Sequence, residues 1–214
     1  MKFDLLGIGN ALVDVEVRVE DKFIEKNSLI KGGMTLSSIE NQKKILKELN
    51  DLSVKISSGG SAANTAHGLS VLGGKAYYLG RVANDKYGKY YTEDMQSCGV
   101  EFSGIGNELS DTGTCVVLVT PDGERTMLTH LGASSSLHHG DINEKIIEDS
   151  TMVYIEGYLW TGEETRKAAE KLAQIAKINN IPIAFTLSDA FVVNNFKKQL
   201  TSFILKDVDI LFCN

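Results

Sequence analysis

The sequence predicts an α/β protein that has a mostly parallel sheet and a second, smaller antiparallel sheet. Between residues 151 and 212, strand-like and helix-like segments alternate, which is typical of parallel strands joined by right-handed helical crossovers. Residues 3–8 form a short apolar run, as expected for a strand that is buried on both faces. Residues 13–19 instead alternate valine with charged side chains, which indicates a strand with one solvated face and therefore a sheet apart from the core.

The first third of the chain is expected to contain two helices between short strands. Apolar residues recur at helical spacing from Ile39 to Leu49 and predict a helix over residues 35–50. Residues 65–72 predict a second helix, which the glycines at 73–74 end. The strands expected in this part of the chain are residues 3–8, 13–19, 54–57 and 76–82.

A hairpin is expected in the middle of the chain. Residues 112–120 and 124–130 are rich in strand-forming residues, and the intervening Pro121-Asp122-Gly123 has the composition of a tight turn. Together with the strand at 13–19, these two strands would form a small, half-exposed antiparallel sheet.

The remaining segments predict a helix at 85–97, strands at 152–155, 183–186 and 208–212, and helices at 163–179 and 194–205. The last strand stops at Cys213 and Asn214 with no helix after it. In open α/β sheets the carboxyl ends of the strands face the ligand crevice, so the chain ends where a binding loop should begin. We therefore expect a chain that is truncated at its C-terminus.

The charge and the cysteines exclude several classes of function. The net charge is −6, and no run of Lys and Arg exceeds a pair, which argues against a nucleic-acid or anionic-membrane surface. No apolar run approaches the length of a membrane span. Cys98, Cys115 and Cys213 are widely spaced and odd in number, which favours buried thiols over a disulfide framework or a zinc site. These features predict a cytoplasmic protein.

The most informative stretch is rich in glycine and other small residues and runs from Ser57 to His67, continuing to Gly88. Gly59 and Gly60 are followed by small residues up to Asn64, a composition that lets the backbone approach a ligand closely where a loop opens into a helix. The alternative is a strand-to-helix turn that uses small residues only for tight packing.

Several familiar sites do not fit. Gly7-Ile8-Gly9 follows a strand but lacks the third glycine and the helix of a dinucleotide-binding motif. A P-loop is excluded because Lys75 is followed by Ala76 instead of Ser or Thr. The adjacent side chains of His138 and His139 diverge, which makes them a poor metal-binding pair.

Two acidic residues are better candidates for a site. Asp14 lies just past the first core strand, where its carboxylate could accept hydrogen bonds from two vicinal hydroxyls. Glu156 follows the apolar run at 152–155 and therefore lies at the carboxyl end of a strand. The alternatives are a solvated strand carboxylate for Asp14 and a helix-capping or ion-paired carboxylate for Glu156.

Taken together, the motifs resemble those of the ribokinase or PfkB family of carbohydrate and nucleoside kinases. The segments that match the family pattern are 59–66 with Gly73, Gly80, Asp85 and Gly88, and also 9–14, 112–114 and 122–126. Segments 188–189 and 209–214 are similar to one part of the family, the adenosine-kinase-like and related sugar-kinase branch. The resemblance implies a ribokinase-like three-layer fold, a mostly parallel central sheet and a small antiparallel β lid. The chain would be the N-terminal part of one such domain, with lid segments at about 12–20 and 111–131.

The resemblance also implies an activity, the ATP-dependent phosphorylation of a hydroxymethyl group of a sugar or nucleoside. Asp14 would bind substrate hydroxyls, with the Gly59-Gly60 backbone and Asn64 in the same pocket and Glu156 as a neighbour. Two further residues, Ser188 and Asn214, would lie in the region of the nucleotide and Mg2+. A homodimer formed through the lid is a further expectation.

Two departures from the family pattern limit this reading. Ala83 stands where the family commonly has glycine, and the family's second signature, which carries the catalytic base, is not in these 214 residues. The chain as given would therefore not be a competent kinase, since loss of a general base typically costs about 100- to 10,000-fold in rate. The alternatives are a non-catalytic sugar- or nucleoside-binding fragment, one half of a split kinase, or a dinucleotide-dependent enzyme.

Overall fold

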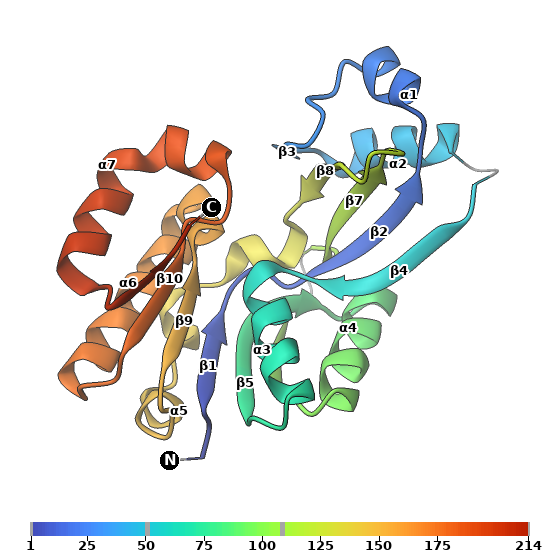
Figure 1. The fold of residues 1–214 in the computed structure, drawn as a ribbon. Coiled ribbons are helices and arrows are strands. Elements are labelled where there is room, and N and C mark those ends of the chain that lie inside the picture. The colour runs from blue at the N-terminus through green and yellow to red at the C-terminus, as the bar shows by residue number, and fades with distance from the viewer. Residues whose placement is uncertain (1, 50–51, 108–109, 214) are drawn as a thin grey trace.

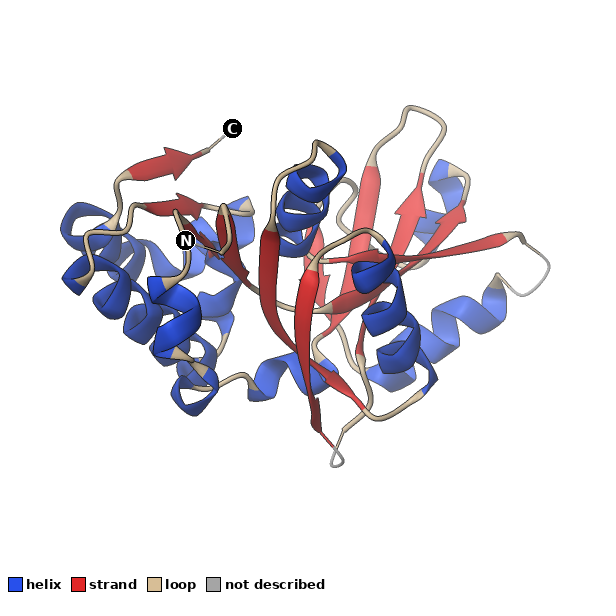
Figure 2. Cartoon of the chain, turned by 90° about the horizontal axis from the view of Figure 1, so that it is seen from below, coloured by secondary structure: helices blue, strands red, loops and turns tan. Residues whose placement is uncertain are grey.

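A six-stranded parallel sheet forms the core of the protein in a computed structural model, which describes residues 2–49, 52–107 and 110–213. The strand order is β11-β10-β9-β1-β5-β6, and every neighbouring pair is parallel (Figure 1). The strands are β1 (Leu5–Ile8), β5 (Ala76–Ala83), β6 (Glu101–Asn107), β9 (Val153–Glu156), β10 (Ile183–Thr186) and β11 (Ile210–Phe212). Strand β11 lies at one edge of this sheet, beside the C-terminus (Figure 2).

Helices cover both faces of the core sheet. Alternate residues of β5 point to opposite faces, so Tyr78 and Val82 join the apolar cluster under α3 and α4, whereas Leu79 joins the cluster under α6. The helices are α3 (Ser61–Val71), α4 (Lys86–Ser97), α5 (Glu144–Glu148), α6 (Glu163–Ile178) and α7 (Ala190–Asp207), with short 3-10 helices η1 (Gly132–Ser136), η2 (His139–Asp141) and η3 (Gly157–Thr161). The expected three-layer α/β arrangement is confirmed.

A second sheet stands to one side of the core (Figure 1). Its order is β3-β8-β7-β2-β4, with β2 (Leu12–Arg18), β3 (Met34–Leu36), β4 (Val54–Gly59), β7 (Gly113–Val119) and β8 (Arg125–His130). It contains the segments expected in the lid together with β3 and β4. We refer to it below as the lid sheet.

The lid sheet is mixed, so the prediction of an antiparallel sheet was wrong in this respect. The hairpin β7–β8 is antiparallel as expected, but β2 pairs parallel with β7, and β3 pairs parallel with β8. The physical reason is connectivity, since only strands joined by a tight turn must reverse direction. Strands β2 and β7 enter the lid sheet separately from the core, and both run in the same direction.

Helices α1 (Asp21–Lys26) and α2 (Ile39–Glu48) give the lid sheet an apolar core of its own. Valines of β2 and β7 pack there against Ile45, while the buried Gln42 donates hydrogen bonds to the carbonyls of Thr114 and Leu128 at 3.0 and 2.7 Å. The helix predicted at 35–50 begins only at Ile39 because β3 occupies residues 34–36. Helices α1 and α5 and strands β3 and β6 were not predicted.

No helix in the described ranges, 2–49, 52–107 and 110–213, is long and apolar enough to cross a membrane. The cysteines differ in burial: Cys115 is buried and Cys98 is partly buried, but Cys213 is exposed. The prediction of a buried thiol was therefore wrong for Cys213, which follows the exposed edge strand β11.

Asp85 connects the core to the lid sheet. Its carboxylate accepts hydrogen bonds from the backbone N–H of Gly88 at the start of α4 and from both the N–H and the hydroxyl of Thr112, at 2.7 to 2.8 Å. The Thr112 hydroxyl in turn accepts a hydrogen bond from the N–H of Ala83. Burial opposes ionisation, but these hydrogen bonds outweigh it and lower the pKa of Asp85.

We expect Asp85→Ala to destabilise the protein by about 2–3 kcal/mol, because it removes a helix cap and also leaves the polar groups of Thr112 without their acceptor. Urea unfolding would measure the change. Asp189→Ala is the matched control, since Asp189 caps α7 by accepting one hydrogen bond from the N–H of Phe191, and this substitution should cost only about 1 kcal/mol. Equal losses in the two variants would contradict a connecting role for Asp85.

Candidate functional site

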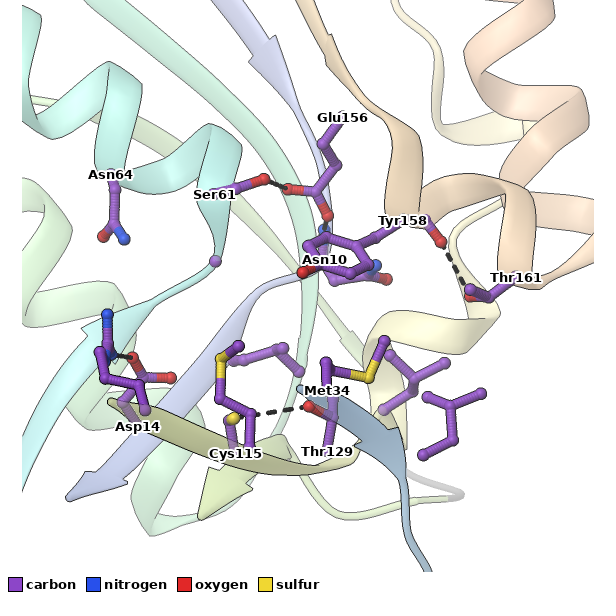
Figure 3. Close-up of a pocket in the computed structure, with 16 residues that line it drawn as sticks. Asn10, Asp14, Met34, Ser61, Asn64, Cys115, Thr129, Glu156, Tyr158 and Thr161 are labelled. Atoms are coloured by element: carbon purple, nitrogen blue, oxygen red, sulfur yellow. Dashed lines mark hydrogen bonds and ion pairs between the residues drawn. The ribbon is translucent and has the colours of Figure 1, made fainter. Parts of the chain in front are cut away.

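A pocket of about 170 Å³ lies between the carboxyl edge of the core sheet and one face of the lid sheet (Figure 3). The lid side is formed by alternate residues of β2, β3 and β8 together with one residue of β7, because side chains two positions apart share one face of a strand. The core side is formed by the start of α3, the end of β9 and η3. The lining residues are Asn10, Leu12, Asp14, Met34, Leu36, Gly60, Ser61, Asn64, Cys115, Arg125, Met127, Thr129, Leu131, Glu156, Tyr158 and Thr161.

Asp14 lies on the pocket face of β2. The face of β2 that was predicted to be solvated lines the pocket at this position. The side chain of Asp14 is only 19% exposed. Burial is the main cause that raises the pKa of Asp14 to about 6, while the nearby charge of Arg125 lowers it and that of Glu16 raises it. The guanidinium of Arg125 lies 3.6 Å from the Asp14 carboxylate.

The two adjacent glycines bring the backbone against Asp14 and Asn10. A Cβ atom on Gly59 would overlap the Asp14 carboxylate, and one on Gly60 would overlap the carbonyl oxygen of Asn10. Gly60 also has a φ of +100°, a conformation that side chains disfavour. The glycine stretch is therefore both a tight turn and part of the pocket wall, and helix α3 starts directly after it.

Glu156 is fully buried and binds the start of α3. Its carboxylate accepts hydrogen bonds from the N–H of Asn10 at 2.7 Å, the hydroxyl of Ser61 at 2.7 Å and the N–H of Ala62 at 3.0 Å. Burial raises the pKa of Glu156, although these hydrogen bonds oppose the shift. The structure thus supports the capping interpretation of Glu156, while its side chain also reaches the pocket wall (Figure 3).

Asn10 and Arg125 are pocket residues that were not selected from the sequence. Asn10 is 2% exposed. Its side-chain Nδ2 lies near the Glu156 carboxylate, but within the described ranges no acceptor meets it in good hydrogen-bond geometry. Its signals in the sequence were its position directly after the first strand and its place in the 9–14 segment that resembles the family pattern. Arg125 could have been found from its period-two spacing with Met127 and Thr129, which line the same wall.

The structure brings most of the predicted residues together. Asp14, Gly60, Asn64 and Glu156 line one pocket, and Gly59 lies directly behind Asp14. Ser188 does not belong to this lining, and its hydroxyl instead accepts a hydrogen bond from the N–H of Tyr158 at 3.3 Å. The predicted residue Asn214 lies outside the described residues.

Two chemically different halves meet in this pocket. One half carries the carboxylate, amide and hydroxyl groups of Asp14, Asn64 and Ser61. The other carries the apolar side chains of Met34, Leu36, Met127 and Leu131, which lie on β3 and β8 or directly after β8, toward the edge of the lid sheet away from β2. Among the described residues, no group of three His, Cys, Asp or Glu side chains could hold a metal ion. This arrangement fits a small molecule that has both hydroxyl groups and an apolar part.

The sequence profile of the pfkB family carbohydrate kinases matches residues 34–214. The chain belongs to this family. Curated relatives include adenosine kinase of Saccharomyces cerevisiae, at 31% identity over 94% of this chain, and guanosine-inosine kinase of Escherichia coli, at 28% identity over 98% of this chain. These alignments cover 60% and 50% of the two relatives, so the chain spans little more than half of their length.

Solved structures agree with the assignment. Adenosine kinase from Sinorhizobium meliloti superposes with a TM-score of 0.94 at 37% identity, over 99% of this chain and 65% of that enzyme. A probable sugar kinase from Rhizobium etli gives a TM-score of 0.93 at 35% identity, over 99% and 64%. The protein therefore has the ribokinase-like fold that the sequence resemblance implied.

We expect Glu156→Gln to destabilise the protein by about 2–3 kcal/mol, because an amide has one acceptor oxygen where three donors now converge on a carboxylate. Thermal and urea unfolding would measure this loss. Glu170→Gln is the control, since Glu170 pairs with Arg166 on the surface and should change stability by less than about 0.5 kcal/mol. A Glu156→Gln protein as stable as the wild type would contradict the role of Glu156 in holding Asn10 and the start of α3 together.

Proposed function

We propose that this chain forms the substrate-binding part of a kinase that uses ATP to phosphorylate a hydroxymethyl group of a nucleoside or sugar. The observation that carries the proposal is the position of Asp14, a mostly buried carboxylate that faces a pocket between the lid sheet and the core. Family membership and the kinases that resemble this chain support the same reaction class.

Asp14 would recognise two neighbouring hydroxyl groups of the substrate. An ionised carboxylate has two oxygens that only accept hydrogen bonds, so it suits a pair of vicinal hydroxyl donors. Asn64, which points toward the pocket from α3 (Figure 3), offers both a donor and an acceptor to the same molecule. Closure of the lid sheet over the bound substrate would exclude water that otherwise competes for the phosphoryl group.

The apolar half of the pocket favours a nucleoside over a small free sugar. Met34, Leu36 and Met127 present apolar surface where a sugar alone would leave it uncovered, whereas a flat heterocyclic base would bury it. Two of the relatives are an adenosine kinase and a guanosine-inosine kinase, which agrees with this choice.

Phosphoryl transfer itself requires little covalent chemistry from a protein and depends on positioning and on charge stabilisation. ATP and Mg2+ are part of the proposal through the family resemblance. The described residues contain no group of three His, Cys, Asp or Glu side chains that could hold a metal ion, so we assign no Mg2+ ligand among them. That this part of the chain lacks the catalytic base remains a prediction. We retain Ser188 and Asn214 only as a predicted nucleotide region.

A second candidate is a non-catalytic nucleoside-binding module or one half of a split kinase. It is favoured by one observation, the coverage of only 50 to 65% of the relatives' lengths. Reading the coding sequence beyond Asn214 separates the two candidates: continuation into a further glycine-rich loop and an aspartate supports the kinase part, and a stop codon supports the binding module or split kinase. A dimer formed through the lid sheet, the absence of a nucleic-acid partner and a cytoplasmic location also remain predictions.

Asp14→Ala should weaken nucleoside binding by about 100-fold, because two charge-assisted hydrogen bonds are lost. Isothermal titration calorimetry with adenosine, inosine, ribose and fructose would measure the loss and identify the substrate class. Glu16→Ala is the matched control, since Glu16 lies two residues further along β2 and does not line the pocket. Unchanged affinity of Asp14→Ala for every ligand would overturn the assignment.

Nucleoside binding should also depend on pH through Asp14, whose pKa is raised to about 6 mainly by burial. The carboxylate accepts both hydrogen bonds and the protonated acid does not, so affinity should fall as the pH drops through 6. We expect binding about tenfold weaker at pH 5 than at pH 7.5. Asp14→Asn should bind weakly at both pH values, and a variant that retained the full pH dependence would show that another group titrates.

A further inference from the structure

A buried tyrosine lies behind the glycine turn of the pocket. Tyr91, on α4, is fully buried, and its hydroxyl donates a hydrogen bond to the carbonyl oxygen of Gly59 at 2.9 Å. Its ring is held in an apolar cluster with Tyr78 and Phe102. Tyr91 itself is not part of the pocket lining, so the carbonyl of Gly59 is held toward the core beneath α4 and away from the cavity.

The direction of this carbonyl determines the direction of the next N–H group. The Gly59–Gly60 peptide bond is trans, so the carbonyl of Gly59 and the N–H of Gly60 point in opposite directions. With the carbonyl held by Tyr91, the N–H is directed to the side where Gly60 lines the pocket. Gly60 lies one residue beyond the β2–β4 pairing, and outside the helices and strands no backbone carbonyl among the described residues accepts this N–H.

A hydroxyl group of a substrate needs such a donor. Each hydroxyl both donates and accepts, and the carboxylate of Asp14 satisfies only its proton. Gly59 lies directly against Asp14, which places the next N–H beside the same carboxylate.

We propose that Tyr91 is a positioning residue that aims the N–H of Gly60 at a substrate hydroxyl, while that hydroxyl donates its own proton to Asp14. This inference rests on the proposed function, namely that the pocket binds the hydroxyls of a nucleoside or sugar.

The test compares ligands that differ by one hydroxyl. Calorimetry on the wild-type chain with adenosine, 2′-deoxyadenosine and 3′-deoxyadenosine would identify the analogue that binds more weakly. In Tyr91→Phe, which keeps the buried ring, adenosine affinity should fall about 3- to 10-fold, while the affinity for that analogue should barely change. The ratio between the two ligands should therefore shrink, an effect that a general loss of stability would not produce.

Tyr90→Phe is the matched control. The hydroxyl of Tyr90 also donates to a carbonyl of β4, that of Ile56 at 3.3 Å, but neither residue lines the pocket. Its removal should leave the ratio between adenosine and the deoxy analogue as in the wild type.

The outcomes separate the two proposals. If the wild type binds none of these ligands, the proposed function fails and this inference fails with it. If the wild type discriminates and Tyr91→Phe does so equally well, this inference alone is overturned. Should Tyr91→Phe not fold, the amide resonance of Gly60 in the wild type decides, since it should shift more with adenosine than with the weaker analogue. Equal shifts with the two ligands would overturn the inference.

Discussion

The carboxylate of Glu156 joins three segments that are far apart in the sequence: the turn after β1, the start of α3 and the end of β9. Burying a carboxyl group is costly unless hydrogen-bond donors replace its water. Here Asn10, Ser61 and Ala62 supply those donors, and the positive end of the α3 dipole lies beside the carboxyl group. These hydrogen bonds therefore fix the distance between the turn after β1 and the start of α3. They also fix the core side of the pocket, which these two segments line.

Because the turn after β1 is held there, β2 leaves the core in a defined direction and carries Asp14 across the pocket. The glycines at 59–60 then have little freedom. Gly59 must pass directly under the Asp14 carboxylate, and Gly60 must pass under the carbonyl of Asn10, so any side chain at either position would push these segments apart. One buried carboxyl group, one strand and one glycine turn thus define the polar half of the pocket.

The lid sheet has its own apolar core, which α1 and α2 complete. The hydrogen bonds between Asp85 and Thr112 and those from Tyr90 and Tyr91 to β4 join it to the core. A sheet with a separate apolar core can move as a unit, which is what the proposed closure of the lid sheet requires. The hydrogen bonds to Thr112 give Asp85 a structural role although it lies outside the pocket. Asp85 belongs to the same motif as the glycine stretch.

The sequence by itself determined the α/β class, the parallel core, the hairpin at 112–130 and the tight turn at glycines 59–60. These follow from periodicity and from glycine chemistry, which act over a few neighbouring residues. The role of Asp14 was predicted from the family resemblance and remains a prediction. The tertiary structure alone decided the mixed pairing of the lid sheet, the capping role of Glu156 and the place of Asn10 and Arg125 in the pocket. Each of these depends on contacts between segments far apart in the chain, such as the 146 residues between Asn10 and Glu156, and no local pattern encodes such contacts.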